Sequence, residues 1–154
     1  MSIKLDSANL VDAKFLNIPY VLGKKDFSGS DCIGLCLLYL SEHGIDFKYD
    51  DKMGPVYEHW WEANPFRLMN AVSEYGKAIY YTSAKKFDLM LFFGEEQLNR
   101  FPMCMAVLVD DRHFLMALPD KGSFVQMFNK HWRGMLWGTI RLKKVVEAGL
   151  SVWE

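Results

Sequence analysis

Cysteine, charge of one sign and long apolar runs are all scarce in this sequence of 154 residues. The cysteines form no CxxC pair and are odd in number, unlike the disulfide framework of a small secreted domain; they are Cys32, Cys36 and Cys104. The net charge is -1, which gives no whole-molecule attraction for nucleic acid or for an anionic membrane. We therefore expect reduced thiols and no nucleic-acid partner.

A targeting segment and a linker are also missing. Residues 1–15 contain no basic stretch followed by an apolar core and a small-residue cleavage site. No stretch approaches the roughly eighteen apolar residues that a membrane span needs. Repeats, low-complexity tracts and Pro/Gly/Ser-rich linkers are absent. The sequence therefore predicts one domain over residues 1–154, made in a cytoplasm, with neither a signal peptide nor a membrane span.

Apolar residues, by contrast, are plentiful: hydrophobic residues make up 51% of the chain, enough for one sizeable core. The most apolar segment runs from Ser30 to His43 and stops at Gly44, a residue type that favours left-handed helix ends. It predicts a buried helix that Ser30 or Asp31 caps. Cys32 then falls in the first turn, where exposed amides and the helix dipole favour a thiolate.

A second helical region is expected from Tyr57 to Tyr75. Asn64 is the predicted N-cap, Pro65 fits the first helical position and Gly76 is the stop. Tyr57 opens an aromatic segment of this region. We expect such segments mainly to supply core residues.

The rest of the chain predicts strands. Five short runs are rich in aromatic and branched residues, and polar or Gly-containing turns separate them; they span 87–93, 103–109, 113–118, 123–128 and 135–142. The break at Asp110, Asp111 and Arg112 predicts a tight hairpin. Helices first and strands afterwards predict an α+β fold, with the buried helix packed on one face of an antiparallel sheet.

Four segments resemble the signature of the NlpC family of papain-like cysteine peptidases. They are PYVLG at 19–23, DCIGL at 31–35, HGI at 43–45 and FDLMLFF at 87–93, where Phe87 replaces the usual Gly of a Gly-Asp strand. The closing segment HWRGMLWGTIR is similar to the end of the versions found in tailed-bacteriophage tail proteins. The resemblance covers roughly Ile18 to Arg141. It implies a papain-like NlpC fold, with Cys32 as the candidate nucleophile.

The resemblance also implies two residues that assist the thiol, and the sequence lacks both at the expected positions. The family pairs the cysteine with a histidine that opens the strand H-x-G-I, and a second polar residue twelve positions on orients that histidine. In this chain the two positions fall on Cys104 and Met116. A thiol accepts a proton only as a thiolate and a thioether does not titrate, so these positions supply no base.

The four histidines are the remaining candidates for a base. His113 falls at the end of the tight turn, so its ring should lie near the hairpin tip and away from Cys32. His43 ends the helix that Cys32 begins, about 16 Å away at a rise of about 1.5 Å per residue. His59 and His131 lie in aromatic segments, where packing and surface roles are usual. If a loop folds back toward Cys32, His59, His131 or His113 could still supply the base, so these three stay open as alternatives.

Two other states of the cysteines are open. Cys32 and Cys36 share a helix face and, with Cys104, would give three thiolate ligands for a metal, although no fourth ligand is evident. The family geometry brings Cys32 and Cys104 close together, so a disulfide is the other alternative if their Cα atoms lie within about 7 Å. We expect free thiols, no metal and no cofactor.

Three functions fit a family fold without its histidines. We favour a non-catalytic structural or assembly component of a phage tail tip, located in the virion, with the aromatic segments around Trp60, Trp61 and Trp132 buried against other tail proteins. The second is an active cysteine endopeptidase or amidase that cleaves peptidoglycan peptides during DNA entry. There Cys32 attacks the carbonyl, and its backbone N–H and Tyr20 stabilise the developing charge.

The third function is a module that binds cell-wall peptide without cleaving it. Tyr20 and Asp31 are the candidate ligand-binding residues for this reading. The plainer interpretation, which we prefer, is that Tyr20 packs at the edge of the cleft and Asp31 caps the helix.

Overall fold

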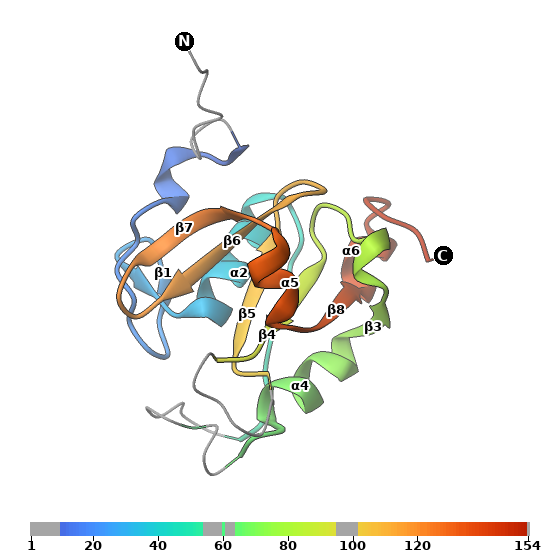
Figure 1. Cartoon of the computed structure of the whole chain (residues 1–154), viewed down its shortest axis with the longest axis horizontal. Coiled ribbons are helices and arrows are strands. Elements are labelled where there is room, and N and C mark those ends of the chain that lie inside the picture. The colour runs from blue at the N-terminus through green and yellow to red at the C-terminus, as the bar shows by residue number, and fades with distance from the viewer. Residues whose placement is uncertain (1–9, 54–59, 61–63, 95–101, 154) are drawn as a thin grey trace.

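A curved antiparallel sheet of six strands forms the centre of this computed structural model (Figure 1), which describes residues 10–53, 60, 64–94 and 102–153. The strand order across the sheet is β3-β8-β4-β5-β6-β7. In chain order the strands are β3 (Gly76–Ile79), β4 (Leu89–Phe92), β5 (Cys104–Leu108), β6 (His113–Leu118), β7 (Gly122–Met127) and β8 (Leu136–Leu142).

The remaining elements surround this sheet. A small two-stranded sheet pairs β1 (Lys25–Asp26) with β2 (Gly29–Ser30). The helices are the 3₁₀ turns η1 (Ala13–Phe15) and η2 (Tyr81–Ser83) and the α-helices α2 (Cys32–Glu42), α4 (Arg67–Tyr75), α5 (Lys130–Gly134) and α6 (Lys143–Glu147). No helix in the described parts of the chain is long and apolar enough to cross a membrane. The predicted α+β fold is confirmed.

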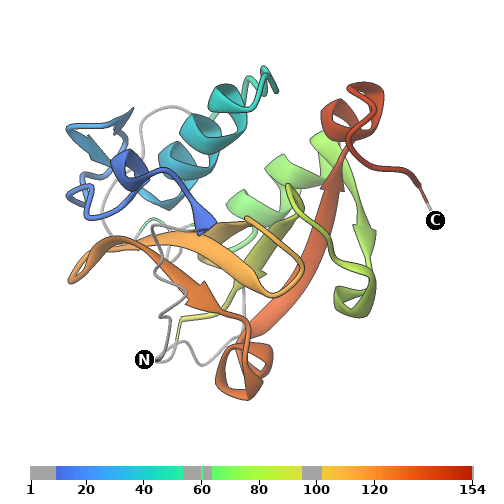
Figure 2. The same ribbon diagram turned by 90° about the horizontal axis from the view of Figure 1, so that it is seen from above.

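Each face of the sheet carries its own apolar cluster. Residues alternate between the faces along a strand, so β6 sends Leu115 to one cluster and Phe114 to the other. The first cluster includes Leu35 and Leu40 of α2, which are fully buried against β5 and β6. The second includes Trp132 of α5. Figure 2 shows α2 and α5 on opposite sides of the sheet.

The ends of α2 follow from its sequence as predicted. The Asp31 side chain caps the helix by accepting a hydrogen bond from the Gly34 N–H at 2.7 Å. At the other end Gly44 has a φ of +79°, the left-handed conformation that stops the helix after the His43 C-cap. The Asp110 side chain likewise closes the predicted hairpin, because it accepts from the backbone N–H of Arg112 and of His113.

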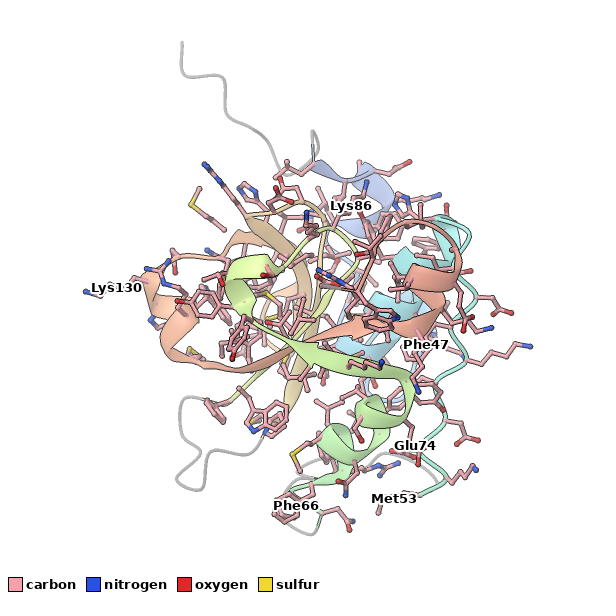
Figure 3. The ribbon with its side chains drawn as sticks, turned by 90° about the vertical axis from the view of Figure 1, so that its right-hand side faces the viewer. Phe47, Met53, Phe66, Glu74, Lys86 and Lys130 are labelled. Carbon is pink, nitrogen blue, oxygen red and sulfur yellow. The ribbon has the colours of Figure 1, made fainter. Side chains whose placement is uncertain are left out.

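The prediction for the second helical region is wrong at the expected N-cap, Asn64, while residues 57–59 and 61–63 of that region lie outside the described residues. Within the described residues α4 begins at Arg67, with Phe66 as an N-cap that makes no side-chain hydrogen bond. Asn64 contributes its carbonyl instead, which accepts from the Arg67 N–H at 3.1 Å, so Asn64 and Pro65 form a turn that leads into the helix. Gly76 does end the helix, and there β3 begins. Phe66 and Glu74 mark the two ends of α4 in Figure 3.

All five predicted strands are present, with ends shifted by at most two residues. Strand β3 was not predicted, because Gly76–Ile79 is short and exposes its two middle side chains, Lys77 and Ala78. Pairing with β8 makes it a strand. Gly76 is required there, because a Cβ would collide with the Arg141 carbonyl of β8. Such a contact across the fold leaves no local signal.

A buried ion pair ties β8 to the turn before β4. The Arg141 guanidinium donates to both carboxylate oxygens of Asp88, at 3.0 and 2.7 Å, and both side chains are fully buried. Arg141 also donates to the carbonyls of Ser83 and Val152, so it joins three segments of chain. Asp88 therefore has a structural role, because it joins β8 to the turn before β4.

Phe87 stands where the resembling family has Gly, and the backbone explains that preference. Its φ is +78°, a left-handed conformation that costs a residue with a Cβ roughly 1 kcal/mol. The ring is buried and packs against Tyr39 at 6.1 Å and His43 at 5.3 Å between centroids. Replacing Phe87 with Gly would relieve this strain but lose the burial of the ring. The loss is larger, since truncating a buried Phe costs about 3–5 kcal/mol.

At position 87 we expect a glycine variant to be more stable than an alanine variant. Phe87→Gly and Phe87→Ala should both lower the free energy of unfolding, with the alanine variant less stable by about 1 kcal/mol because only glycine adopts the positive φ freely. Phe114, inside β6, is the matched control, where Gly should be worse than Ala. Urea unfolding of the four variants decides, and an alanine variant at least as stable as the glycine variant at position 87 contradicts the account.

Removing one partner of the buried ion pair should be far more damaging than removing both. Asp88→Leu leaves the Arg141 charge buried without its carboxylate, and we expect a loss of about 3–5 kcal/mol in chemical denaturation. The double variant Asp88→Leu/Arg141→Met should recover part of that loss. Asp46→Asn is the control, since the Asp46–Lys48 pair is 3.9 Å apart and exposed, and it should change nothing measurable. Equal stability of Asp88→Leu and the parent protein would refute the role of the pair.

Candidate functional site

A pocket of about 380 Å³ lies where the N-terminus of α2 meets the start of β5 and the end of β6. Its walls are largely apolar and include Leu22, Ile33, Trp60, Leu68, Met103 and Leu118. Four of the residues singled out in the sequence line it: Tyr20, Asp31, Cys32 and Cys104. The fold therefore gathers the residues that the family resemblance had marked at the start and at the middle of the chain.

The two thiols lie beside each other at this pocket. The backbone N–H of Met105, the residue after Cys104, donates to the Cys32 sulfur at 3.5 Å, which places the two thiols side by side. The neighbouring Cys32 thiol, together with burial, raises the pKa of the Cys104 thiol well above its usual value. Cys104 therefore stays protonated at neutral pH, and a protonated thiol cannot take a proton from Cys32.

All three cysteines are free, as expected. Cys36 lies one turn after Cys32 in α2, fully buried, and burial raises the pKa of its thiol well above the usual value. Among the residues that the structure describes, no group of three or more His, Cys, Asp or Glu side chains is arranged to hold a metal ion. The three cysteines are thus free thiols, and among the described residues they form no metal-binding group.

The motif residues around Cys32 hold α2 in place. Asp31 accepts from the Gly23 N–H at 2.8 Å as well as from Gly34, which fastens the preceding loop to the helix. Burial raises the pKa of the Asp31 carboxyl, although these hydrogen bonds oppose the shift. Gly34 has no room for a Cβ, because the Lys24 carbonyl of the loop lies against it. The Asp-Cys-x-Gly spacing is therefore demanded by packing.

Tyr20 lies at the pocket with its backbone bridged to Ser30. Burial, and then the nearby Cys32 and Asp31, raise the pKa of its hydroxyl, so it is neutral at physiological pH. A neutral hydroxyl can donate a hydrogen bond to a ligand carbonyl. Tyr20 is thus half-buried and available to a bound molecule, in addition to packing at the cleft edge.

Met116 is placed elsewhere. It is 1% exposed and belongs to the cluster on the face of the sheet away from α2, with Phe114 and Ala106. Its neighbours on β6, Ala117 and Leu118, line the pocket in its place. The structure therefore brings together Cys32 and Cys104 but does not bring Met116 to the pocket wall.

The described histidines lie away from the pocket lining. His113 sits at the hairpin tip, as expected, with Nδ1 3.0 Å from the Asp110 carboxylate. His43 stacks on Tyr39 at the far end of α2, and burial lowers the pKa of its ring. His131 lies in α5 beside Trp132. His59 is outside the described residues.

One polar feature of the wall was not anticipated from the sequence. Arg67, at the start of α4, forms a hydrogen-bonded ion pair with Asp51, and its Nη2 donates at 3.1 Å. Burial would raise the pKa of Asp51, but the hydrogen bonds from Arg67 hold it below the usual value. The two residues are 16 positions apart in the sequence. Without a periodic pattern, the sequence carries no sign of their pairing.

Comparisons with known proteins support the fold and nothing finer. No protein-family model matches the chain, and no curated protein matches it in sequence. Similar solved structures include the NlpC/p60 domain of the peptidoglycan hydrolase SagA, which is 21% identical with a TM-score of 0.54 over 90% of this chain and 100% of that domain.

Others are longer proteins. An NLP/P60-family protein of Staphylococcus aureus subsp. aureus Mu50 that is similar to lipoproteins is 18% identical, with a TM-score of 0.58 over 88% of this chain and 41% of its own. NlpC2 from Trichomonas vaginalis is 17% identical, with a TM-score of 0.61 over 88% of this chain and 45% of its own. The chain thus spans less than half of these relatives. It has the papain-like fold of NlpC/P60 cell-wall hydrolase domains.

The buried thiol of Cys36 should make stability depend on pH. Its folded pKa is raised, so the native state keeps a proton that the unfolded chain releases above about pH 8.5. The stabilisation is present below that pH and is lost as the pH rises toward the folded pKa. Between pH 9 and 11, the free energy of unfolding should fall more steeply for the parent than for Cys36→Ala, by up to about 1.4 kcal/mol per pH unit.

Cys36→Ser is the control for this effect. It also lacks the titrating thiol but differs from alanine in packing, so its curve should be offset from that of Cys36→Ala and parallel to it. Urea unfolding across the pH range provides the slopes. A parent curve parallel to both variants would contradict a raised pKa for Cys36.

Proposed function

We propose that this chain is a non-catalytic NlpC/P60-fold domain that binds a short peptide in the Cys32 pocket without cleaving it. The carrying observation is that the pocket is open to a ligand while the side chain next to the nucleophile position is the protonated thiol of Cys104. The proposal thus rests on two features: a pocket that can hold a peptide, and a thiol beside Cys32 that cannot accept its proton.

The chemistry of amide cleavage explains why the missing acceptor matters. The attacking sulfur must lose its proton, and the leaving amine must gain one, so a group that titrates near neutral pH has to sit between them. Cys104 cannot fill this role because its pKa is raised. Acid-base catalysis contributes roughly 10²- to 10⁴-fold, and the described residues that line the pocket offer no histidine to supply that factor.

The pocket favours a peptide with a compact apolar side chain. Trp60, Leu68 and Leu118 offer an apolar wall, while the Tyr20 hydroxyl can donate to a peptide carbonyl. The Asp51–Arg67 pair lies on the same wall and offers charge to the polar end of a ligand. A cell-wall stem peptide carries groups of both kinds and is the ligand that we propose.

The aromatic segments support a pocket more than a docking face. Trp132 packs edge-on against Phe92 and Phe114, each at 5.2 Å, so it fills the molecule's own second cluster. Trp60 lines the pocket, and Trp61 lies outside the described residues. We therefore propose that any attachment to phage tail proteins, and location in a virion, uses other surfaces. This placement depends on the resemblance of the closing segment alone.

An active endopeptidase or amidase is the second candidate. It is favoured by the position of Cys32 at the N-terminus of α2, with the Met105 N–H directed at its sulfur. Amides in this arrangement stabilise a thiolate and the oxyanion that forms after attack. A histidine from outside the pocket lining would have to supply the base.

Titration with a soluble cell-wall stem peptide tests whether the pocket binds the proposed ligand. By isothermal calorimetry we expect Cys32→Ala to bind like the parent, and Trp60→Ala to bind about tenfold more weakly because the apolar wall is lost. Trp137→Ala, an exposed Trp on β8, is the matched control and should bind normally. Absence of peptide binding by the parent would refute the proposal.

The same samples test for hydrolysis. Mass spectrometry after overnight incubation with the peptide and with whole peptidoglycan should detect no new amine or acid fragments. Fragments that disappear in Cys32→Ala would establish the enzyme instead, and His59→Ala would then show whether that histidine is the base.

A further inference from the structure

The proposed function leaves the chemistry of the two pocket thiols unused. Cys32 is 8% exposed, Cys104 is half-buried, and both line the same pocket, so a small solute can reach the pair. The backbone N–H of Met105, the residue after Cys104, donates to the Cys32 sulfur at 3.5 Å, so the two thiols lie side by side although 72 positions separate them in sequence. Two reduced sulfurs held in contact at a solvent-connected site are a dithiol, whose typical reaction is oxidation to a disulfide.

The third cysteine is excluded from this site. Cys36 follows Cys32 on the same helix but has no exposed surface and does not line the pocket. A reagent that enters the pocket therefore meets two thiols and not three. The chain thus contains its own internal control for thiol chemistry at the pocket.

We propose that Cys32 and Cys104 form an oxidisable pair, which hydrogen peroxide that enters the pocket converts to a disulfide. The Cys32 sulfur attacks one peroxide oxygen, the O–O bond breaks, and the products are a sulfenic acid on Cys32 and one water. The Cys104 sulfur then attacks the Cys32 sulfur, and the S–O bond breaks. The hydroxyl leaves with the Cys104 proton as a second water, so two thiols are oxidised and one peroxide is reduced.

The order of the two cysteines follows from their surroundings. Cys32 has the Met105 N–H directed at its sulfur, which stabilises negative charge there during attack. Cys104 keeps its proton, since the neighbouring Cys32 and burial raise the pKa of its thiol, and this suits the resolving thiol because its proton is needed to release water. The disulfide would link the first residue of α2 to the first residue of β5 at the floor of the pocket. It requires neither peptide binding nor catalysis, so it does not depend on the proposed function.

The test is stoichiometric oxidation of the purified chain by hydrogen peroxide. After about one equivalent, intact mass spectrometry should show a loss of about 2 Da, and denaturing alkylation should label one thiol where the reduced chain gives three. Peptide mapping should find Cys32 joined to Cys104. Because the link closes a long loop, Tm should rise by roughly 5–15 °C and return after reduction with dithiothreitol.

Two variants keep the result interpretable. Cys36→Ala should form the same disulfide, while Cys104→Ala should stop at a Cys32 sulfenic acid that dimedone traps. A linked peptide that contains Cys36, a disulfide between two chains, or oxygen added to a cysteine of the parent without the 2 Da loss would each overturn the proposal. So would three alkylatable thiols after about ten equivalents of peroxide.

Discussion

The contact between the first turn of α2 and the start of β5 is the constraint on which the site depends. Asp31 caps the helix and also fastens the Gly23 loop, and Gly34 lets that loop approach to a distance that a Cβ would forbid. These local interactions fix where Cys32 points. The sheet then brings Cys104 to it across the fold, and a pocket forms where the two elements meet.

Local signals in the sequence were sufficient for most of the architecture. The apolar segment with an Asp cap and a Gly stop predicted α2, and the runs of branched and aromatic residues predicted five strands of one sheet. The predictions that failed concern features that depend on contacts between residues distant in sequence. Strand β3 exists because β8 pairs with it, and α4 starts at Arg67, where the ion pair with Asp51 forms. Neither partnership leaves a pattern within a short window of sequence.

The site was predictable only in part, for a similar reason. Motif spacing gathered Tyr20, Asp31 and Cys32, since all three lie near one helix end, and the resemblance supplied Cys104. Met116 was expected by counting along the hairpin, yet strand alternation places it in the opposite cluster. The expected spacing did not show that Ala117 and Leu118, and not Met116, would line the pocket. The fold thus presents Cys32 at the pocket with Cys104 beside it.

The central claim is that no imidazole serves the Cys32 thiol. It is tested most directly by NMR titration of the four histidine rings in the parent and in Cys32→Ala. A ring paired with the thiol would titrate differently once the sulfur is gone, because a neighbouring charge shifts a pKa by about one unit or more. The account predicts four titration curves that the substitution leaves unchanged. A shift of about one unit in any one of them would contradict it and identify the missing base.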